Sequence, residues 1–281
     1  YSHTAVSKAN GSHFFNLMWA KDSKSVAFLR ETDSATKEVT VNYYRIADKK
    51  LFSLDYASKA DSKNMEVFKR TTYAISDDGK KVFFMLAKKK DPNLEKPDVP
   101  EIWHGNDKWL YADRQRQQTE GDIPKVVVWY PDMGKYLQIS NDELPAIMLS
   151  GQQEYAVLYN KFSYGLQSKY YEEADFYLTN LKDGSKELML KKQSVDLNQI
   201  GFDPFSNRIL YYRESNWWMY DPVKKTHTNL TKKVTTHWDN YNTSDAPHQF
   251  GAYGNPGWTN DGKNVLLYDA NDIWLVAIDG S

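Results

Sequence analysis

The sequence predicts an all-β protein, a β-propeller built of about five four-stranded antiparallel blades. Aromatic residues make up 15% of the chain, and their rings pack well on the pleated surface of strands. Short apolar runs alternate with Asp, Asn and Gly turn signals along most of the chain. This order of strand, polar turn and strand recurs five times, which favours a propeller over a β-sandwich with accidental regularity.

The last repeat, residues 253–281, shows the unit most clearly. A short strand near Trp258 leads into residues 260–263, Asn-Asp-Gly-Lys, where Gly accepts a positive φ and Asn and Asp tolerate one. The apolar run 265–268 suits a buried strand, and a third strand follows at 273–278. The chain stops where a fourth strand should start.

Weaker copies of this unit lie upstream at a regular spacing. The mean step between copies is near 60 residues, longer than the ~40–50 residues of the best-known propeller repeats. We expect the first-strand aromatic rings to be largely buried. The equivalent first-strand positions are Trp19, Ile75, Met148, Phe202 and Trp258. The predicted blades cover approximately residues 12–56, 71–140, 145–191, 197–232 and 253–281.

Two segments interrupt the repeat. Residues 88–122 begin with three prolines, which exclude regular structure, and continue with helix formers that suit a short helix outside the blade. Residues 233–252 are alternately polar and aromatic and predict a long loop at a blade rim. Loops of this length in compact domains are often functional, although plain connections fit both segments equally well.

The composition excludes several classes of partner and site. The net charge of −1 gives no global field that would attract nucleic acid or an anionic membrane. No apolar run approaches the roughly 18 residues of a membrane span. The absence of Cys excludes disulfides and thiolate metal sites but does not settle the compartment. The chain starts at Tyr1 without a signal peptide, so we expect a processed or excised piece.

No catalytic residue, metal ligand or cofactor site is expected. The G-x-S-x-G pentapeptide that exposes the nucleophile of α/β-hydrolases is absent from the sequence. His237 and His248 are the closest pair of histidines, and solvated loop histidines are a better interpretation than a zinc site. The Asp-Gly pairs lack the spacing of calcium loops and predict hairpin turns.

Three other patterns have a functional and a plain interpretation. Glu172 and Glu173 follow two tyrosines and could bind an ammonium group, but the start of a strand at 175–181 with two solvated acids explains them more simply. Lys88-Lys89-Lys90 is interpreted as solvated surface. Asn229-Leu230-Thr231 fits a glycosylation sequon, a tripeptide that is common by chance.

Particular stretches carry a resemblance to a known family. The repeated pattern W/F-x-x-D-x-x-x-V resembles TolB-like and dipeptidyl-peptidase-type propellers. The stretches that sharpen it are Glu101-Ile102-Trp103-His104, Asn216-Trp217-Trp218-Met219-Tyr220 with Asn229-Leu230-Thr231, and the ending that holds Gly257-Trp258, Tyr268-Asp269 and Asp272-Ile273-Trp274. Nearly the whole chain is thus similar to the N-terminal propeller of prolyl oligopeptidase family serine peptidases of Bacteroidetes.

The resemblance implies a function that composition does not. In that family the propeller precedes a catalytic α/β-hydrolase domain and restricts access to small peptides. It therefore implies a C-terminal hydrolase domain and peptide substrates as partners, and a periplasmic or secreted location. Glu172 and Glu173 match the glutamate pair of dipeptidyl peptidases only as adjacent residues, and the role is not carried over. The alternative is a stand-alone binding propeller with no hydrolase attached.

Blade number follows from the same resemblance. Seven or eight blades are usual in the family, so five blades predict an open arc or a fragment of a larger ring. The other possibility is that residues 1–7 pair with the strand at 273–278 and close a five-bladed ring. The open arc is favoured.

Overall fold

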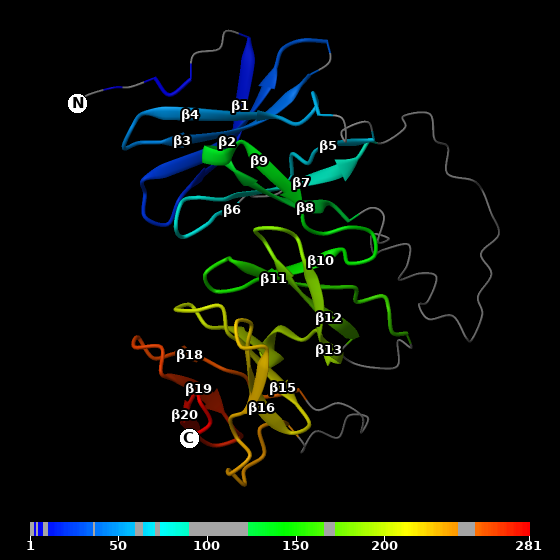
Figure 1. Ribbon diagram of the computed structural model, residues 1–281, viewed down its shortest axis with the longest axis vertical. Helices are drawn as coiled ribbons and strands as arrows, with labels where there is room; N and C mark the ends of the chain where they lie inside the picture. Colours follow the sequence, from blue (N-terminus) through cyan, green and yellow to red (C-terminus); the bar gives the residue numbers. More distant parts are fainter. Residues whose placement is uncertain are drawn as a thin grey trace, which may run out of the picture. The chain divides into compact units, whose positions relative to one another are not determined.

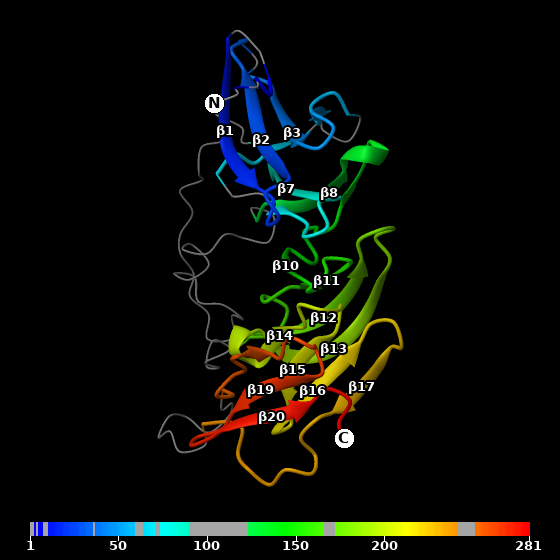
Figure 2. The same cartoon turned by 90° about the vertical axis from the view of Figure 1, so that its left-hand side faces the viewer.

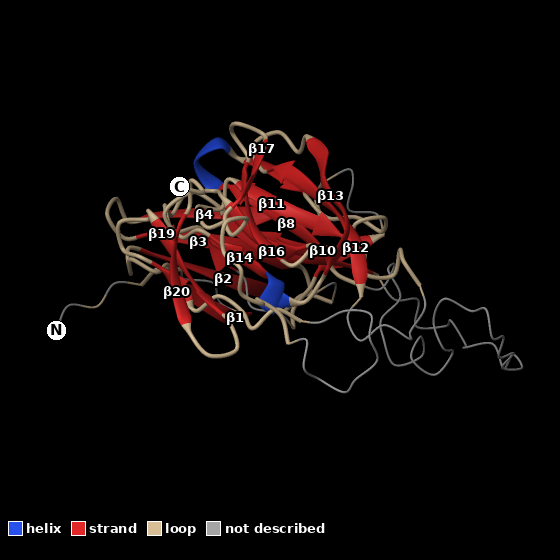
Figure 3. Cartoon of the chain, turned by 90° about the horizontal axis from the view of Figure 1, so that it is seen from below, coloured by secondary structure: helices blue, strands red, loops and turns tan. Residues whose placement is uncertain are grey.

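A computed structural model describes residues 3, 5–7, 11–35, 37–59, 64–70, 74–89, 123–165, 172–240 and 251–281. These residues form five antiparallel sheets, numbered 1 to 5 in chain order (Figure 1). The chain divides into two compact units, one with sheets 1 and 2 and the other with sheets 3 to 5. Strands dominate both units, and the described helices are short 3-10 turns (Figure 3). The predicted all-β class is confirmed.

Sheets 1 and 2 form the first unit. In sheet 1 the strands follow chain order: β1 (Ser12–Trp19), β2 (Ser25–Thr32), β3 (Val39–Arg45) and β4 (Lys50–Asp55). Sheet 2 contains β5 (Met65–Val67), β6 (Ala74–Ile75), β7 (Val82–Lys88), β8 (Lys125–Tyr130) and β9 (Lys135–Gln138), with the 3-10 turn η2 (Pro131–Met133) between the last two. Both β5 and β6 pair with β7, so this sheet begins earlier than residue 71.

Sheets 3, 4 and 5 form the second unit. Sheet 3 contains β10 (Ala146–Leu149), β11 (Tyr155–Tyr159), β12 (Glu173–Asn180) and β13 (Lys186–Ser194). After the 3-10 turn η3 (Leu197–Gln199), sheet 4 contains β14 (Ile200–Phe202), β15 (Ile209–Arg213), β16 (Asn216–Asp221) and β17 (Thr226–Asn229). Sheet 5 has three strands, β18 (Gly257–Trp258), β19 (Asn264–Tyr268) and β20 (Ile273–Ala277).

One hairpin is repeated in all five sheets. In each, the last residue of the strand before the first turn (β6 in sheet 2) pairs with the residue seven positions later, and this spacing identifies the equivalent positions. In sheet 3 that residue is Leu149, one position after the expected Met148, because the hydrogen-bond register rather than apolar character fixes the alignment. The pairs are Trp19 with Val26, Ile75 with Val82, Leu149 with Ala156, Phe202 with Ile209, and Trp258 with Val265.

The turn of sheet 5 shows why Asp-Gly pairs end strands here. The Thr259 hydroxyl donates to Asp261 Oδ1 at 2.6 Å and accepts from the Asn264 backbone N–H at 3.1 Å. Asp261 also accepts from the Lys263 N–H at 3.0 Å. Gly262 has a φ of 64°, a conformation that glycine adopts without steric cost. The hydrogen bond from Thr259 lowers the pKa of Asp261, in keeping with a turn carboxylate that accepts local donors.

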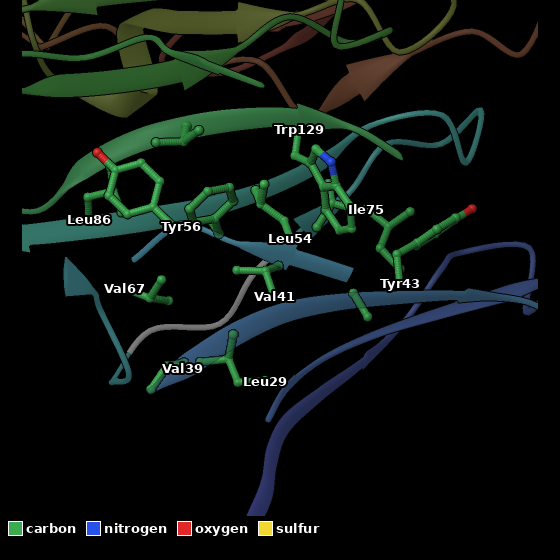
Figure 4. Close-up of a cluster of buried hydrophobic side chains, with 14 of the residues drawn as sticks. Leu29, Val39, Val41, Tyr43, Leu54, Tyr56, Val67, Ile75, Leu86 and Trp129 are labelled. Atoms are coloured by element: carbon green, nitrogen blue, oxygen red, sulfur yellow. The ribbon is translucent and has the colours of Figure 1, made fainter. Parts of the chain in front are cut away.

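Neighbouring sheets within each unit pack face to face. We call the face toward the preceding sheet the back face, and the face toward the following sheet the front face. Leu29 and Val41 on the front of sheet 1 pack in one cluster with Leu86 and Trp129 on the back of sheet 2 (Figure 4). The same arrangement joins sheets 3 and 4 and sheets 4 and 5, where β19 and β20 lie against β15 and β16 (Figure 2).

The expectation that the aromatic rings at the first-strand positions are largely buried is wrong for Trp19. Phe202 and Trp258 are partly buried and pack against the cores between sheets. Trp19, at the equivalent position, is 55% exposed. The reason is its place on the back face of sheet 1, where no preceding sheet in its unit packs against it. Burial at this repeat position depends on the neighbouring sheet and not on the residue.

The series of sheets is open. Within the described part of the chain, β20 pairs with β19 and with no other strand, so sheet 5 lacks a fourth strand. Residues 3 and 5–7 form no strand, and Val6 packs against the back face of sheet 1. The alternative in which residues 1–7 close the ring beside residues 273–278 therefore has no support among the residues that are described. In the same residues, no helix is long and apolar enough to cross a membrane.

Candidate functional site: the loop end of the sheets

Each sheet has two unlike ends. The first-to-second and third-to-fourth connections lie at one end, which we call the turn end, and each spans four to six residues. The second-to-third connections and the links between sheets leave from the opposite end, which we call the loop end. The longest connections, 89–124, 160–172 and 230–256, all leave from loop ends. Because binding residues concentrate on long connections held by a rigid scaffold, the loop end of each sheet is a candidate binding surface.

The predicted interruptions belong to this end. The chain leaves β7 after Lys88 and enters β8 at Lys125, both at the loop end of sheet 2. Most of the predicted excursion at 88–122 lies outside the described residues. The predicted loop at 233–252 is described at its two ends only, and His248 falls outside them.

A carboxylate cluster lies at the loop end of sheet 3 and consists of Glu172, Glu173 and Asp175. Glu173 is the first residue of β12, as the strand interpretation expected, but both glutamates are half-buried rather than fully solvated. Asp175 accepts from the Tyr164 hydroxyl at 2.7 Å and from the Lys192 backbone N–H at 2.9 Å. Glu173 and Asp175 share one face of the strand because side chains alternate with a period of two.

Two tyrosines, Tyr159 and Tyr164, also lie at the loop end of sheet 3. Burial, together with the charge of Glu172, raises the pKa of Tyr159. The hydrogen bond to Asp175 raises the pKa of Tyr164. Glu173 and Asp175 beside the neutral Tyr164 can attract a cationic group, and Lys192 already places its Nζ 5.3 Å from the Tyr164 ring centroid. A role for Asp175 and Tyr164 was not predicted from the sequence, although the spacing of two between Glu173 and Asp175 was a usable signal.

The described parts of the connection 230–256 contact residues of sheets 4 and 5. Trp238 is only 1% exposed and meets Trp274 edge-on, with ring centroids 5.7 Å apart. Asp239 accepts from the Tyr212 hydroxyl at 2.7 Å, and it forms a β-bridge with Ala252. Burial, reinforced by Asp239, raises the pKa of Tyr212. The sequence pattern predicted a rim loop here and gave no sign that its ends enter the core.

Asp269 fixes the loop end of sheet 5. Its carboxylate accepts from the Thr236 hydroxyl and from Trp274 Nε1, each at 2.7 Å. The backbone N–H groups of Asn271 and Asp272 donate to it at 2.8 and 2.7 Å. Burial opposes ionisation, but these four donors outweigh it and lower the pKa of Asp269 to about 2. The role of this residue is to hold β20 and the 230–256 segment together.

The remaining sequence candidates have structural partners. Lys88 and the buried Lys125 both pair with Asp142, at 3.0 and 2.8 Å, so the lysine run is not only solvated surface. Thr231 of the sequon is fully buried and accepts from the Trp217 backbone N–H at 3.0 Å. His237 is exposed. Among the described residues no group of three or more metal-binding side chains occurs.

No protein-family model matches the chain, and no curated protein matches it. Among solved structures it is similar to Porphyromonas gingivalis dipeptidyl peptidase 4, with a TM-score of 0.51, 13% identity, and coverage of 94% of this chain and 38% of that chain. A putative dipeptidyl aminopeptidase IV from Bacteroides ovatus matches with a TM-score of 0.45 and 9% identity, over 94% of this chain and 39% of that one. TolB from Acinetobacter baumannii matches with a TM-score of 0.36 and 11% identity, over 96% and 53%.

The likeness to dipeptidyl peptidase 4 shows the fold alone: the chain is all-β and built of propeller-like antiparallel sheets. It spans well under half of the dipeptidyl peptidase 4 chain that it matches.

Proposed function

We propose that the chain is the non-catalytic propeller region of a secreted or periplasmic serine peptidase of the prolyl oligopeptidase family. In this role it restricts access to a C-terminal α/β-hydrolase domain and helps to select peptide substrates. The observation that carries the proposal is the match of 94% of this chain to 38% of Porphyromonas gingivalis dipeptidyl peptidase 4.

The arrangement of the sheets supports a gating role. Their turn ends are closed by short connections that bond to one another, as in the ion pair of Lys21 with Asp77 at 2.9 Å between the first turns of sheets 1 and 2. Their loop ends carry every long connection and the carboxylate cluster. Bonded turns at one end of the sheets and long loops at the other suit selection of extended peptides.

The chain alone is expected to have no peptidase or esterase activity, because the sequence holds no nucleophile elbow. Purified protein should not turn over chromogenic aminoacyl or acyl esters above a heat-treated control. Turnover that a serine-directed phosphonate abolishes would contradict this expectation.

The peptidase assignment is tested on the natural gene and its full product. The reading frame after Ser281 should encode an α/β-hydrolase with a G-x-S-x-G segment. Removal of residues 1–281 from that product should raise hydrolysis of long unfolded polypeptides relative to short peptides. A frame without a hydrolase would instead favour the stand-alone binding propeller, and an unchanged ratio would exclude gating.

A further inference from the structure

A histidine of sheet 4 lies in a cluster of aromatic rings that the proposed function does not use. His227 is on β17, the short outer strand of the sheet, directly opposite Tyr220 of β16. Its ring lies against that of Tyr220, with centroids 4.6 Å apart, and it meets the Tyr211 ring edge-on at 5.8 Å. Both tyrosines are only 3% exposed and belong to the core between sheets 3 and 4. A side chain that can change its charge near neutral pH therefore contacts this core.

One hydrogen bond fixes the protonation state of this histidine. The Tyr211 hydroxyl and His227 Nδ1 are 2.8 Å apart. Burial raises the pKa of Tyr211, so the phenol keeps its proton. Among the described residues this hydroxyl has no other hydrogen-bond partner, so it donates its proton to Nδ1. His227 is then neutral and carries its own proton on Nε2.

Protonation of His227 is incompatible with this hydrogen bond. A proton on Nδ1 turns the acceptor into a donor and leaves the buried Tyr211 hydroxyl without an acceptor, which is costly in a core. Burial lowers the pKa of His227, and the charge of Arg213 lowers it further. His227 is nevertheless exposed at the edge of the sheet, so protons reach it from solvent.

The carboxylates around the cluster already have cationic partners. Glu187 of β13 accepts from the Tyr220 hydroxyl at 3.4 Å and pairs with Lys225, and Asp221 pairs with Arg208 at 3.7 Å. A charge on His227 would therefore find no unmatched carboxylate in this group. The charged and titratable groups around Tyr220 and His227 are Tyr155 of β11, Glu187 of β13, Tyr211 and Arg213 of β15, Tyr220 and Asp221 of β16, and Lys225 in the turn before β17.

We propose that His227 is a pH-sensitive latch, which holds β17 against Tyr211 and Tyr220 while it is neutral and loosens this strand when it is protonated. Within the described residues β17 has four residues and pairs with β16 alone, so few other contacts hold it. A histidine with a lowered pKa stabilises the fold fully above its ordinary pKa of 6.5, and this contribution is lost as the pH falls below that value. The strand should therefore loosen between neutral and mildly acidic pH.

NMR and hydrogen exchange on the full chain test the latch. At pH 7.5 the His227 ring should show the Nε2–H tautomer, and the protection factors of the β17 amides should fall at least about threefold between pH 7.5 and pH 5. Asn can accept from Tyr211 and does not titrate, so His227→Asn should keep the protection and abolish the fall. His13→Asn, at an exposed position on β1, is the control and should leave the fall unchanged. An Nδ1–H tautomer, or an equal fall in His227→Asn, would overturn the proposal.

Tyr211→Phe separates the latch from a general effect of acid. This variant removes the hydroxyl that needs an acceptor and keeps both the aromatic ring and His227. The pKa of His227 should rise toward its ordinary value, because no phenol stabilises the neutral form, and the fall in β17 protection should shrink. If the pKa of His227 and the fall in protection both stay as in the wild type, the hydrogen bond to Tyr211 does not control β17 and the proposal is wrong.

Discussion

The back face of sheet 1 and the front face of sheet 5 are alike in topology and unlike in burial. Neither face has a neighbouring sheet in its own unit. On sheet 1, Val26, Phe28 and Tyr44 are nevertheless only 5–7% exposed. On sheet 5, Ile273 and Leu275 are more than 60% exposed. The two outer faces therefore differ in what covers them.

Side chains of sheet 1 and of the N-terminal segment cover part of its back face, whereas Trp19 on the same face stays exposed. Val6 and Leu51 pack against the buried residues, and the Phe14 ring lies 5.8 Å from that of Phe28. No comparable cover lies over sheet 5 among the described residues. Within the described residues, the chain itself covers much of the outer face of sheet 1 and leaves Ile273 and Leu275 on the outer face of sheet 5 exposed.

The largest expected effect comes from the covered face. Phe28→Ala should destabilise the first unit by about 3–5 kcal/mol, because it removes a buried ring and leaves a cavity. Leu275→Ala on the exposed face should change the stability of the second unit by no more than about 0.5 kcal/mol. Urea unfolding of each variant at low protein concentration measures both. Equal losses would show that the two faces do not differ as described.

The tryptophans at one repeat position give the next largest contrast. Trp258 packs against the core between sheets 4 and 5, whereas Trp19 is 55% exposed. Trp258→Ala should cost about 3 kcal/mol. Trp19→Ala should cost about 1 kcal/mol or less. If the two variants lost the same stability, the neighbouring sheet would not determine burial at this position.

The sequence predicted the sheets well because their signals are local. Turn residues and apolar runs are read within a few positions, and they located the hairpins at Trp19, Phe202 and Trp258. Register is less local, so Met148 was chosen in place of Leu149. The exposure of Trp19 could not be predicted, because burial at this position depends on a neighbouring sheet that sequence spacing does not reveal.

The candidate site was predicted less completely than the fold. Glu172 and Glu173 were visible as an adjacent pair, but the hydrogen bonds that Asp175 accepts come from Tyr164 and from the Lys192 N–H, 11 and 17 positions away. In the sequence, Asp269 stood out only as part of the C-terminal stretch that resembles the family. The four hydrogen-bond donors to its carboxylate come from residues up to 33 positions away. Such networks leave no simple periodic pattern in a sequence.

A smaller effect should follow from the cover of sheet 1. Val6 is half-buried, so Val6→Ser should destabilise the first unit by about 1 kcal/mol, a fraction of the value for full burial. The variant should also expose Phe28 and speed hydrogen exchange in β2. Val223→Ser, at a 78% exposed position, is the control and should change neither property. Unchanged exchange in β2 would show that Val6 is not part of the cover.

The smallest effect concerns pH and the packed back face of β20. Asp269 holds Trp274 on that face, and its donors lower the pKa from the ordinary 3.8 to about 2. A group whose pKa is lower in the folded state stabilises the fold above its unfolded pKa, and this contribution is lost as pH falls through the folded pKa. The contribution of Asp269 should therefore be complete above about pH 4 and lost between pH 4 and 2.

Thermal unfolding between pH 6 and 2 tests this assignment. The melting temperature of the second unit should fall by about 2–4 °C more in the wild type than in Asp269→Asn over the interval from pH 4 to 2. The reason is that the amide cannot titrate, so this part of the pH dependence disappears. Asp33→Asn, which removes an exposed carboxylate from the first unit, should leave the slope for the second unit unchanged. Parallel profiles for wild type and Asp269→Asn would mean that other carboxylates control the acid stability of β20.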